Sequence, residues 1–285
     1  MRKLKCIAAW LLALAFATPV ALLTACNRQE TLTTPPVSTE SESVGETLPE
    51  TDSETESSSP PAVSEPEEET PTAPPQAEYI RCTGDSVNIR SGAGTSYSVL
   101  GSAEKGTSYT VLEKKGSWYK TYYRGKTGYI YASYATVFTL EKTEDTDVEN
   151  VITEGYKTLG TPYVYGAVRF HDGNGKLLGG FSAQKFDCSS LIQYIFYKGA
   201  GVLLRSNTRT QVTQGEYVAK ADLQRGDCMY FTNEERQYNK GIERVGHVAL
   251  YLGDDYILHT SSDYARIEKM TAKRWKFFIE ARRFL

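Results

Sequence analysis

Hydrophobic and polar positions divide the chain into four stretches with different patterns. Residues 1–25 are apolar after three basic residues, and residues 27–78 hold nine of the eleven prolines and no aromatic residue. Residues 79–139 show short apolar alternations separated by glycines, whereas residues 146–285 combine helical and strand spacings. The pattern predicts a small all-β unit and a larger α+β unit, both preceded by segments that do not fold.

The first stretch is typical of an export signal. Arg2, Lys3 and Lys5 precede apolar residues that form too short a run for a stable membrane-spanning helix. The run Leu23-Thr24-Ala25-Cys26 resembles the lipobox of bacterial lipoproteins. The resemblance implies that residues 1–25 are removed and that lipidated Cys26 anchors the protein to the outer face of a bacterial membrane. The alternative is an ordinary signal sequence with an incidental cysteine.

Residues 26–78 are predicted to be this cysteine followed by a disordered acidic linker. Residues 27–78 hold 13 acidic residues and one basic residue, and such a composition buries too little apolar surface to fold. The formal net charge of −3 therefore hides a division, because residues 79–285 carry 28 basic and 22 acidic residues. A basic body favours polyanionic partners, but charge alone does not choose among nucleic acid, teichoic acid and anionic lipid.

We expect residues 79–139 to form a small β-barrel. Its motifs are Val87-Asn88-Ile89-Arg90-Ser91-Gly92, Trp118 and Gly125-Lys126-Thr127-Gly128-Tyr129-Ile130, and as a set they resemble bacterial SH3 domains. The resemblance implies a module that binds cell-wall peptide or packs beside a catalytic domain. Interleaved basic and aromatic residues also suit nucleic acid. An exported protein does not meet nucleic acid, so we expect no such partner.

The unit at residues 146–285 begins with two predicted helices. Thr146 and Glu149 match a capping box, and Asp187-Cys188-Ser189-Ser190 opens the second helix. Cys188 then lies in the first helical turn, where free N–H groups and the positive helix end favour a thiolate. The thiolate is the form that attacks carbonyl carbon. The alternative is a small buried cysteine with no chemical role.

Two of the three histidines lie in a predicted hairpin. The strands are 245–252 and 256–260, and they carry His247 and His259. A three-residue loop pairs positions that sum to 508 and places both histidines on one face, whereas a two-residue loop separates them. The first register gives a base oriented by a second imidazole, as in a papain-like site. A two-histidine metal site lacks a third ligand at suitable spacing, and we expect no metal and no cofactor.

The order of these motifs resembles that of NlpC-type cell-wall peptidases. The motifs that carry the resemblance are Pro162-Tyr163, Asp187-Cys188-Ser189, Leu204-Arg205-Ser206 with Gln211, Arg225-Gly226-Asp227, Gly246-His247-Val248 and His259. The resemblance covers nearly all of 146–285 and implies a papain-like α+β catalytic domain. Together with the upstream unit it implies a lipid-anchored, monomeric cysteine endopeptidase of peptidoglycan stem peptides, whose usual bond is D-γ-glutamyl to a diamino acid.

The resemblance also assigns roles to individual residues. Cys188 would be the nucleophile, His247 the general base and then acid, and His259 its orienter. Tyr163 would lie near the oxyanion or substrate, and Asp187 and Ser189 would contact the substrate peptide, Asp187 through a free amine. An N-cap is the competing interpretation of Asp187. Other reactions on the same fold, by an N-acetylmuramoyl amidase or a transpeptidase, stay open, as does a wall-binding lipoprotein without activity.

Three features depart from the motif pattern or lie outside it. The loop at about 167–186 is long and rich in glycine, so it leaves specificity open. Cys228 stands at a strand position that is usually apolar, and we expect it in the core. His171 matches no motif, and we expect it at the surface.

Overall fold

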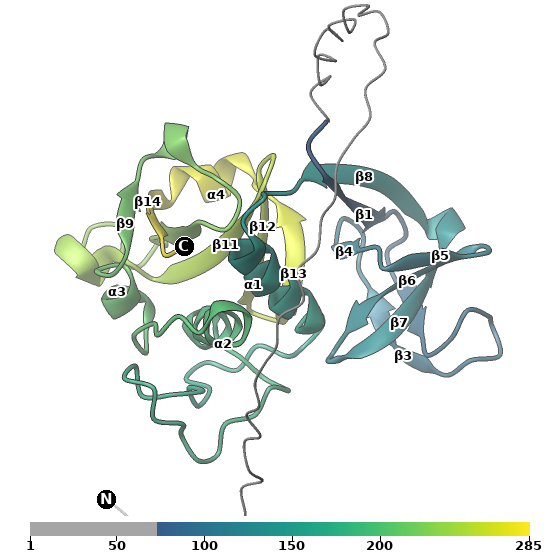
Figure 1. Ribbon diagram of the computed structural model, residues 1–285, viewed down its shortest axis with the longest axis horizontal. Helices are drawn as coiled ribbons and strands as arrows, with labels where there is room; N and C mark the ends of the chain where they lie inside the picture. Colours follow the sequence, from purple (N-terminus) through teal and green to yellow (C-terminus); the bar gives the residue numbers. More distant parts are fainter. Residues whose placement is uncertain (1–72) are drawn as a thin grey trace, which may run out of the picture. The chain divides into compact units, whose positions relative to one another are not determined.

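The computed structural model describes residues 73–285. The predicted signal segment, Cys26 and most of the predicted linker lie outside these residues. The described chain forms a nine-stranded sheet in the order β8-β1-β4-β13-β12-β11-β10-β14-β9 and a five-stranded sheet in the order β3-β2-β7-β6-β5 (Figure 1). Two longer helices and two short ones accompany the larger sheet, which confirms the predicted α+β class.

The smaller sheet contains the strands that the alternating pattern predicts. Its strands are β2 (Val87–Arg90), β3 (Val99–Ala103), β5 (Glu113–Lys115), β6 (Trp118–Tyr123) and β7 (Lys126–Tyr131). In β6 every second side chain is buried, namely Tyr119, Thr121 and Tyr123. The alternation on one strand therefore separates barrel core from surface, and it divides the tyrosines of this unit between the two environments.

The first unit also contributes strands to the larger sheet. These are β1 (Gln76–Cys82), β4 (Ser108–Thr110) and β8 (Ala135–Glu141). Residues 76–78, assigned to the linker above, thus belong to β1. Ser108 of β4 pairs with Ile267 of β13 (Tyr264–Lys269), so the sheet continues from the first unit into the second.

The second unit supplies the remaining strands of the larger sheet. They are β9 (Glu216–Val218), β10 (Cys228–Phe231), β11 (His247–Gly253), β12 (Tyr256–Ser261), β13 and β14 (Phe278–Arg283). All four residues of β10 are buried, and Cys228 lies in the core as expected. Its thiol and that of Cys82 are both free and buried.

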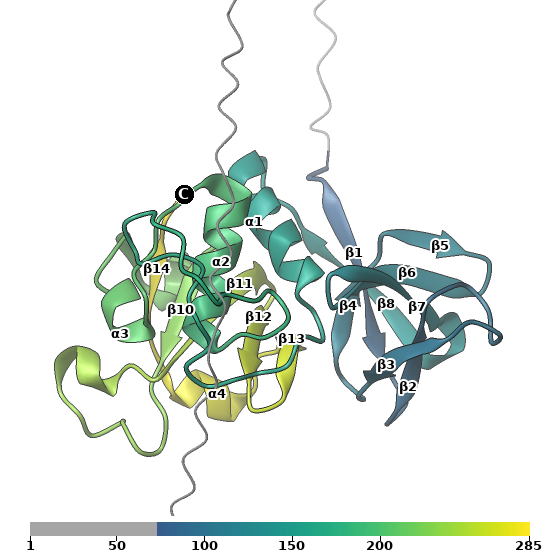
Figure 2. The same cartoon turned by 90° about the horizontal axis from the view of Figure 1, so that it is seen from below.

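Helices α1 (Thr146–Lys157) and α2 (Cys188–Ala200) pack against each other and cover the sheet (Figure 2). The predicted capping box at Thr146 is wrong, because Asp145 is the N-cap and accepts from the N–H groups of Asp147 and Val148. Carboxylates cap helices at least as well as threonine, so the neighbouring Asp145 takes the position. The two short helices are α3 (Thr208–Gln211) and α4 (Ala272–Lys276).

One buried arginine joins both units. The guanidinium of Arg225 binds both carboxylate oxygens of Glu149 on α1, with its Nε 2.6 Å from Oε1, and also donates to the carbonyl of Leu252 on β11. It donates as well to the hydroxyls of Tyr79 on β1 and Tyr156 on α1. Glu149 is thus an ion-pair partner rather than the second half of a capping box. A bidentate pair of this kind fixes orientation as well as charge.

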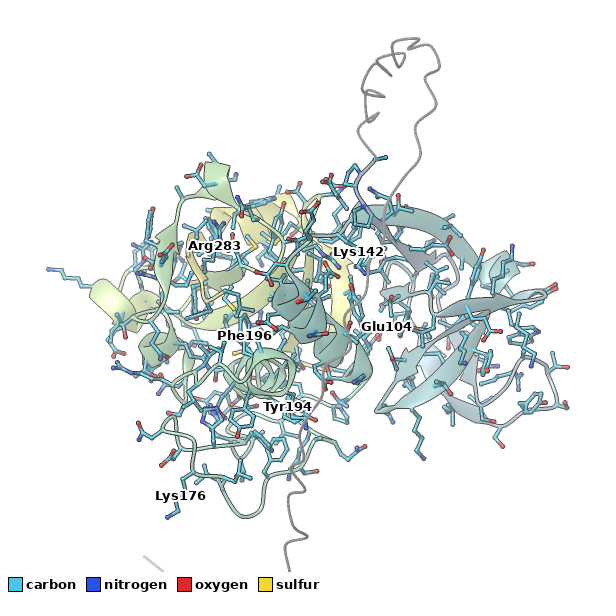
Figure 3. The ribbon with its side chains drawn as sticks, viewed as in Figure 1. Glu104, Lys142, Lys176, Tyr194, Phe196 and Arg283 are labelled. Atoms are coloured by element: carbon cyan, nitrogen blue, oxygen red, sulfur yellow. The ribbon has the colours of Figure 1, made fainter. Side chains whose placement is uncertain are left out.

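The long loop before α2 is anchored by aromatic side chains. Tyr194 of α2 contacts Phe181 and Phe186 of this loop, while Phe196, on the other side of the helix, contacts Phe284 (Figure 3). The surface position expected for His171 is wrong, since its side chain is fully buried beside Tyr197. Burial lowers its pKa. Within residues 73–285, no helix is long and apolar enough to span a membrane.

We predict that Gly199→Ala destabilises the protein by about 2 kcal/mol, because overpacking of a tight contact typically costs about 1–3 kcal/mol. A Cβ at Gly199 would lie 2.5 Å from the Cα of Val151, where α2 meets the backbone of α1. Denaturant unfolding gives the free energy. The matched control is Gly179→Ala, since a Cβ there meets no atom within 4 Å. Equal stability of both variants would contradict the predicted contact.

Candidate active site

Cys188 is the first residue of α2, as the sequence predicts. Asp187 precedes it as the N-cap, and Asp187 and Ser190 form a reciprocal capping box. The residue Cys188 is only 9 % exposed, so its thiol is shielded from bulk water. The cap holds the start of the helix, and with it the sulfur, in one orientation.

The sulfur lies against strand β11. The backbone N–H groups of Val248 and Ser189 act on the sulfur and lower the pKa of the thiol, which favours the thiolate. Val248 directly follows His247, so the helix start and the histidine strand meet at the sulfur. Burial nevertheless dominates and raises the pKa of Cys188 to about 12, with Asp187 adding to the increase. Desolvation thus opposes the thiolate that the helix end favours.

The two histidines lie on one face of the hairpin. Leu250 pairs with Leu258 and Tyr251 with Ile257, which is the register of the three-residue loop. The ring nitrogens His247 Nε2 and His259 Nδ1 are 3.1 Å apart. Burial lowers the pKa of His247 well below its usual value, and His259 and Arg274 lower it further. His247 is consequently neutral at neutral pH and can accept a proton.

The row of imidazoles ends on a carboxylate that the sequence analysis missed. Glu268 of β13 lies beside His259, with 3.2 Å between Glu268 Oε1 and His259 Nε2. Glu268 also forms an ion pair with Arg274 of α4. Burial would raise the pKa of Glu268, but the contacts with His259 and Arg274 outweigh it and hold the pKa at about 2. Glu268 is therefore ionised. Only the pairing of β12 with β13 brings Glu268 beside His259, and the sequence pattern did not give that pairing.

This charge favours one tautomer of each ring. A carboxylate only accepts, so the contact with Glu268 favours a proton on His259 Nε2, and His259 Nδ1 is then left to accept from His247 Nε2–H. The Nδ1 lone pair of His247 then stays available for the proton of Cys188. The arrangement of a thiol, a neutral base, an orienting imidazole and a carboxylate can perform nucleophilic attack with general-base assistance.

A pocket of about 480 Å3 opens beside these groups. Its lining includes Tyr163 and His247, and its only charged side chains are the cations Lys273 and Arg274. Burial raises the pKa of Tyr163 to about 12, with Cys188 and Asp187 adding to the increase, so its hydroxyl is a donor at neutral pH. Tyr163 and His247 thus line one pocket, while His259 contacts His247 and Cys188 lies close enough to Tyr163 to affect its pKa.

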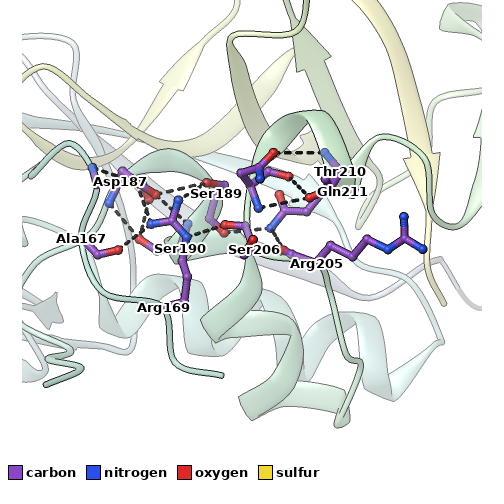
Figure 4. Close-up of polar contacts among 11 residues, drawn as sticks. Ala167, Arg169, Asp187, Ser189, Ser190, Arg205, Ser206, Thr210 and Gln211 are labelled. Atoms are coloured by element: carbon purple, nitrogen blue, oxygen red, sulfur yellow. Dashed lines mark hydrogen bonds and ion pairs between the residues drawn. The ribbon is translucent and has the colours of Figure 1, made fainter. Parts of the chain in front are cut away.

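Asp187 and Ser189 are the two predicted substrate contacts, and the polar atoms of both side chains already bind other groups of the protein (Figure 4). Asp187 accepts from the N–H of Ser190 and the hydroxyl of Ser189, which matches the N-cap interpretation. It also forms an ion pair of 2.8 Å with Arg169, which further donates to the Ser189 hydroxyl. Arg169 was missed because it lies in a loop without periodicity. Among residues 73–285, no cluster of three or more metal-ligating side chains is present.

Comparison with known proteins agrees with this arrangement. Residues 160–283 match the family model of the NlpC/P60 family, and residues 85–136 match that of the bacterial SH3 domain. The chain therefore contains an NlpC/P60 domain preceded by a bacterial SH3 domain, as the sequence motifs predicted, and the predicted fold class is confirmed.

Similar proteins act on the cell wall or on glutamyl bonds. The chain is 32% identical over 127 residues to the gamma-DL-glutamyl hydrolase of Bacillus subtilis, covering 44% of this chain and 26% of that protein. It is 30% identical over 120 residues to the peptidoglycan endopeptidase RipB of Mycobacterium tuberculosis, covering 42% and 46%. The chain thus spans less than half of the length of these relatives. An NlpC/P60 family protein from Bacillus cereus is a similar solved structure, with a TM-score of 0.39, 22% identity, and 73% of this chain and 64% of that chain covered.

We predict that Glu268→Gln lowers kcat roughly 10- to 100-fold with little change in KM, because the amide can donate to His259 and reverse its tautomer. Hydrolysis kinetics on purified muropeptides measure both constants. Glu280→Gln is the matched control, since Glu280 is similarly half-buried and paired with Arg282 on β14. Equal kcat values for Glu268→Gln and Glu280→Gln would show that Glu268 does not act on catalysis through His259.

The raised pKa of Cys188 and the lowered pKa of His247 predict a neutral pair at rest. Because the pKa of His247 is lowered from the usual histidine value of about 6.5, the unprotonated base is available at neutral pH. His247 becomes protonated, and so unable to act as a base, only at a pH well below 6.5. We expect kcat/KM to fall on that acid side. Alkylation of Cys188 by iodoacetamide should accelerate continuously from about pH 6 to pH 9 as the thiolate fraction grows.

The control for alkylation is Cys188→Ala, in which only the buried Cys82 and Cys228 remain among the free cysteines of the described chain. A fast alkylation rate that is constant from about pH 5 upward would show a preformed thiolate–imidazolium pair and contradict the neutral pair.

Proposed function

We propose that this protein is a peptidoglycan hydrolase, a cysteine endopeptidase that cleaves stem peptides. The observation that carries the proposal is the relay of His247, His259 and Glu268. His247 directly precedes Val248, whose backbone N–H acts on the Cys188 sulfur. A buried cysteine of purely structural use would need none of these partners.

The geometry supports a two-stage reaction. The sulfur of Cys188 attacks the peptide carbonyl carbon while its proton passes to His247 Nδ1, and the C–N bond then breaks as His247 returns the proton to the leaving amine. Water activated by His247 hydrolyses the thioester and regenerates the thiol. The main-chain N–H of Cys188, with the Tyr163 hydroxyl near the pocket, supplies donors for the oxyanion.

The relatives suggest the bond. Two are named for hydrolysis at D-glutamyl linkages, the gamma-DL-glutamyl hydrolase and a gamma-D-glutamyl-L-lysine dipeptidyl-peptidase of Bacillus cereus. We propose the D-γ-glutamyl–diamino acid bond as the site of cleavage, in cell-wall remodelling or recycling. Such an activity requires no cofactor.

The location is part of the proposal. A lipidated Cys26 would anchor a monomer to the outer face of a bacterial membrane, and the acidic stretch that follows it, up to the start of β1 at Gln76, would separate the anchor from the folded part because like charges repel. The basic body at residues 79–285 suits an anionic wall. Nucleic acid is not a partner in this setting.

The SH3 domain offers a second contact with the wall. Trp118, Tyr131 and Tyr134 line a pocket of about 660 Å3 on this domain. The rings of Trp118 and Tyr131 are 5.1 Å apart, and the side chain of Tyr134 is 52% exposed. Exposed aromatic rings beside a cavity suit the apolar faces of peptide or sugar, so we propose that this domain holds the polymer near the cleft.

Mass spectrometry of muropeptide digests tests the activity. We expect the wild-type protein to release fragments cut within the stem peptide, and Cys188→Ala to release none, because the sulfur forms the covalent bond. Normal cleavage by that variant would contradict the assignment of the nucleophile. Intact stem peptides freed from sugar would instead indicate an amidase, newly joined peptides a transpeptidase, and binding to sacculi without cleavage a non-catalytic wall protein.

A further inference from the structure

The pocket of about 480 Å3 borders the base of the site and not its nucleophile. His247 and Tyr163 line it, whereas Cys188 at the start of α2 does not. In the two-stage reaction the acyl part of the substrate stays bonded to Cys188, and His247 returns its proton to the leaving amine. The pocket is therefore placed to accept the residue on the leaving side of the scissile bond.

The charged side chains that line this pocket are both cations. They are Lys273 and Arg274 of α4, and within residues 73–285 no carboxylate lines the pocket. His247 adds no negative charge, and its lowered pKa keeps it neutral at neutral pH. Such a wall attracts an oxygen anion and repels an ammonium.

Each cation keeps donors for a ligand. Lys273 Nζ lies 2.8 Å from Glu234 Oε1, but the two side chains are 73% and 70% exposed, and exposed pairs of this kind are held weakly. Within the described chain the guanidinium of Arg274 contacts Glu268 through Nη2, and its Nε has no hydrogen-bond partner. A guanidinium has five N–H donors, so Arg274 can bind a second carboxylate while it keeps the first.

A buried hydroxyl of the same wall also lacks a partner. Thr232 lines the pocket and is 8% exposed, and its Oγ1 has no hydrogen-bond partner among residues 73–285. Buried polar side chains normally have one, so an unpaired donor at a pocket wall indicates a contact that a ligand makes. A hydroxyl can donate to an oxygen anion, which is also the ligand that the two cations favour.

We propose that Lys273, Arg274 and Thr232 form a subsite for a carboxylate of the residue on the leaving side of the scissile bond. This inference rests on the proposed function and specifies that residue. A diamino acid can supply the carboxylate from its main chain, when it ends the peptide, or from a side chain with a second carboxyl group, as in diaminopimelate. A lysine side chain ends in an ammonium and does not supply it.

Four tripeptides with the same L-alanyl-γ-D-glutamyl start distinguish these sources. The parent peptide ends in meso-diaminopimelate, and each of the others has one carboxylate converted to an amide. The amide is on the main chain of the last residue, on its side chain, or on the glutamyl residue. We expect one of the two amides on the last residue to lower kcat/KM about tenfold, because a hydrogen-bonded charge is lost. The amide on the glutamyl residue is the control, since that group belongs to the acyl side.

Substitutions locate the effect in the pocket. Lys273→Glu should lower kcat/KM for the parent peptide about fivefold, but it should have little effect on the peptide whose bound carboxylate is already an amide. The effect of the glutamyl amide should not depend on Lys273. Glu234→Gln releases Lys273 from its partner and should change kcat/KM for the parent in the opposite direction. The matched control is Lys276→Glu, since Lys276 is exposed on the same helix and does not line the pocket.

Thr232→Val removes the unpaired hydroxyl and keeps the shape of the side chain. We expect this variant to be at least as stable as the wild type in thermal unfolding, because a buried polar group without a partner is lost. Its kcat/KM for the parent peptide should nevertheless fall about threefold. A gain in stability without any kinetic change would remove Thr232 from the subsite.

Calorimetry on Cys188→Ala separates this inference from the proposed activity. This variant should bind the parent peptide about tenfold more tightly than the amide that lacks the bound carboxylate, and adding Lys273→Glu should reduce the difference. If the wild type cleaves no peptide but this binding pattern holds, the proposed function fails and the inference stands. Equal kcat/KM and equal Kd for the parent and both amides of the last residue, or binding of no peptide, overturns the inference.

Discussion

The register of the β11–β12 hairpin is the constraint on which the site depends. With Leu250 opposite Leu258, His247 and His259 share a face and their ring nitrogens meet. The ladder is irregular between Tyr251 and Gly253, and both Asp254 and Asp255 have positive φ. Short polar residues adopt that backbone more readily than most, so the turn itself selects the register. A shift by one residue would turn one histidine away and leave Cys188 with an unoriented base.

Charges around the site are compensated in pairs, which leaves the reacting groups neutral. Two arginine–carboxylate pairs lie next to the reacting groups, Arg169–Asp187 beside Cys188 and Arg274–Glu268 beside His259. The thiol and the two imidazoles carry no net charge, since burial disfavours their charged forms. The protein therefore orients its nucleophile with fixed ion pairs, and the charge develops only when the substrate carbonyl is attacked.

Local patterns in the sequence predicted the elements and the central residues, whereas nonlocal contacts stayed hidden. Cys188 at a helix start and the two histidines on a hairpin follow from periodicity and turn length. Glu268 required the pairing of β12 with β13, and Arg169 required the path of a loop that has no period. The pKa of Cys188 was also not predictable, because the helix end is visible in the sequence but the depth of burial is not. His171 was misplaced for the same reason, since a lone histidine in a polar loop carries no sign of the aromatic residues that cover it.

The continuity of the larger sheet has a consequence for whether the two domains can be separated. Strand β13, which holds Glu268, has β4 of the SH3 domain along its outer side, and Tyr79 of β1 reaches the buried Arg225. Excising the NlpC/P60 domain would expose a strand edge next to the catalytic relay, and unprotected edges recruit other strands and promote aggregation. The SH3 domain thus covers this edge of its neighbour, and any module put in its place would have to cover the same edge.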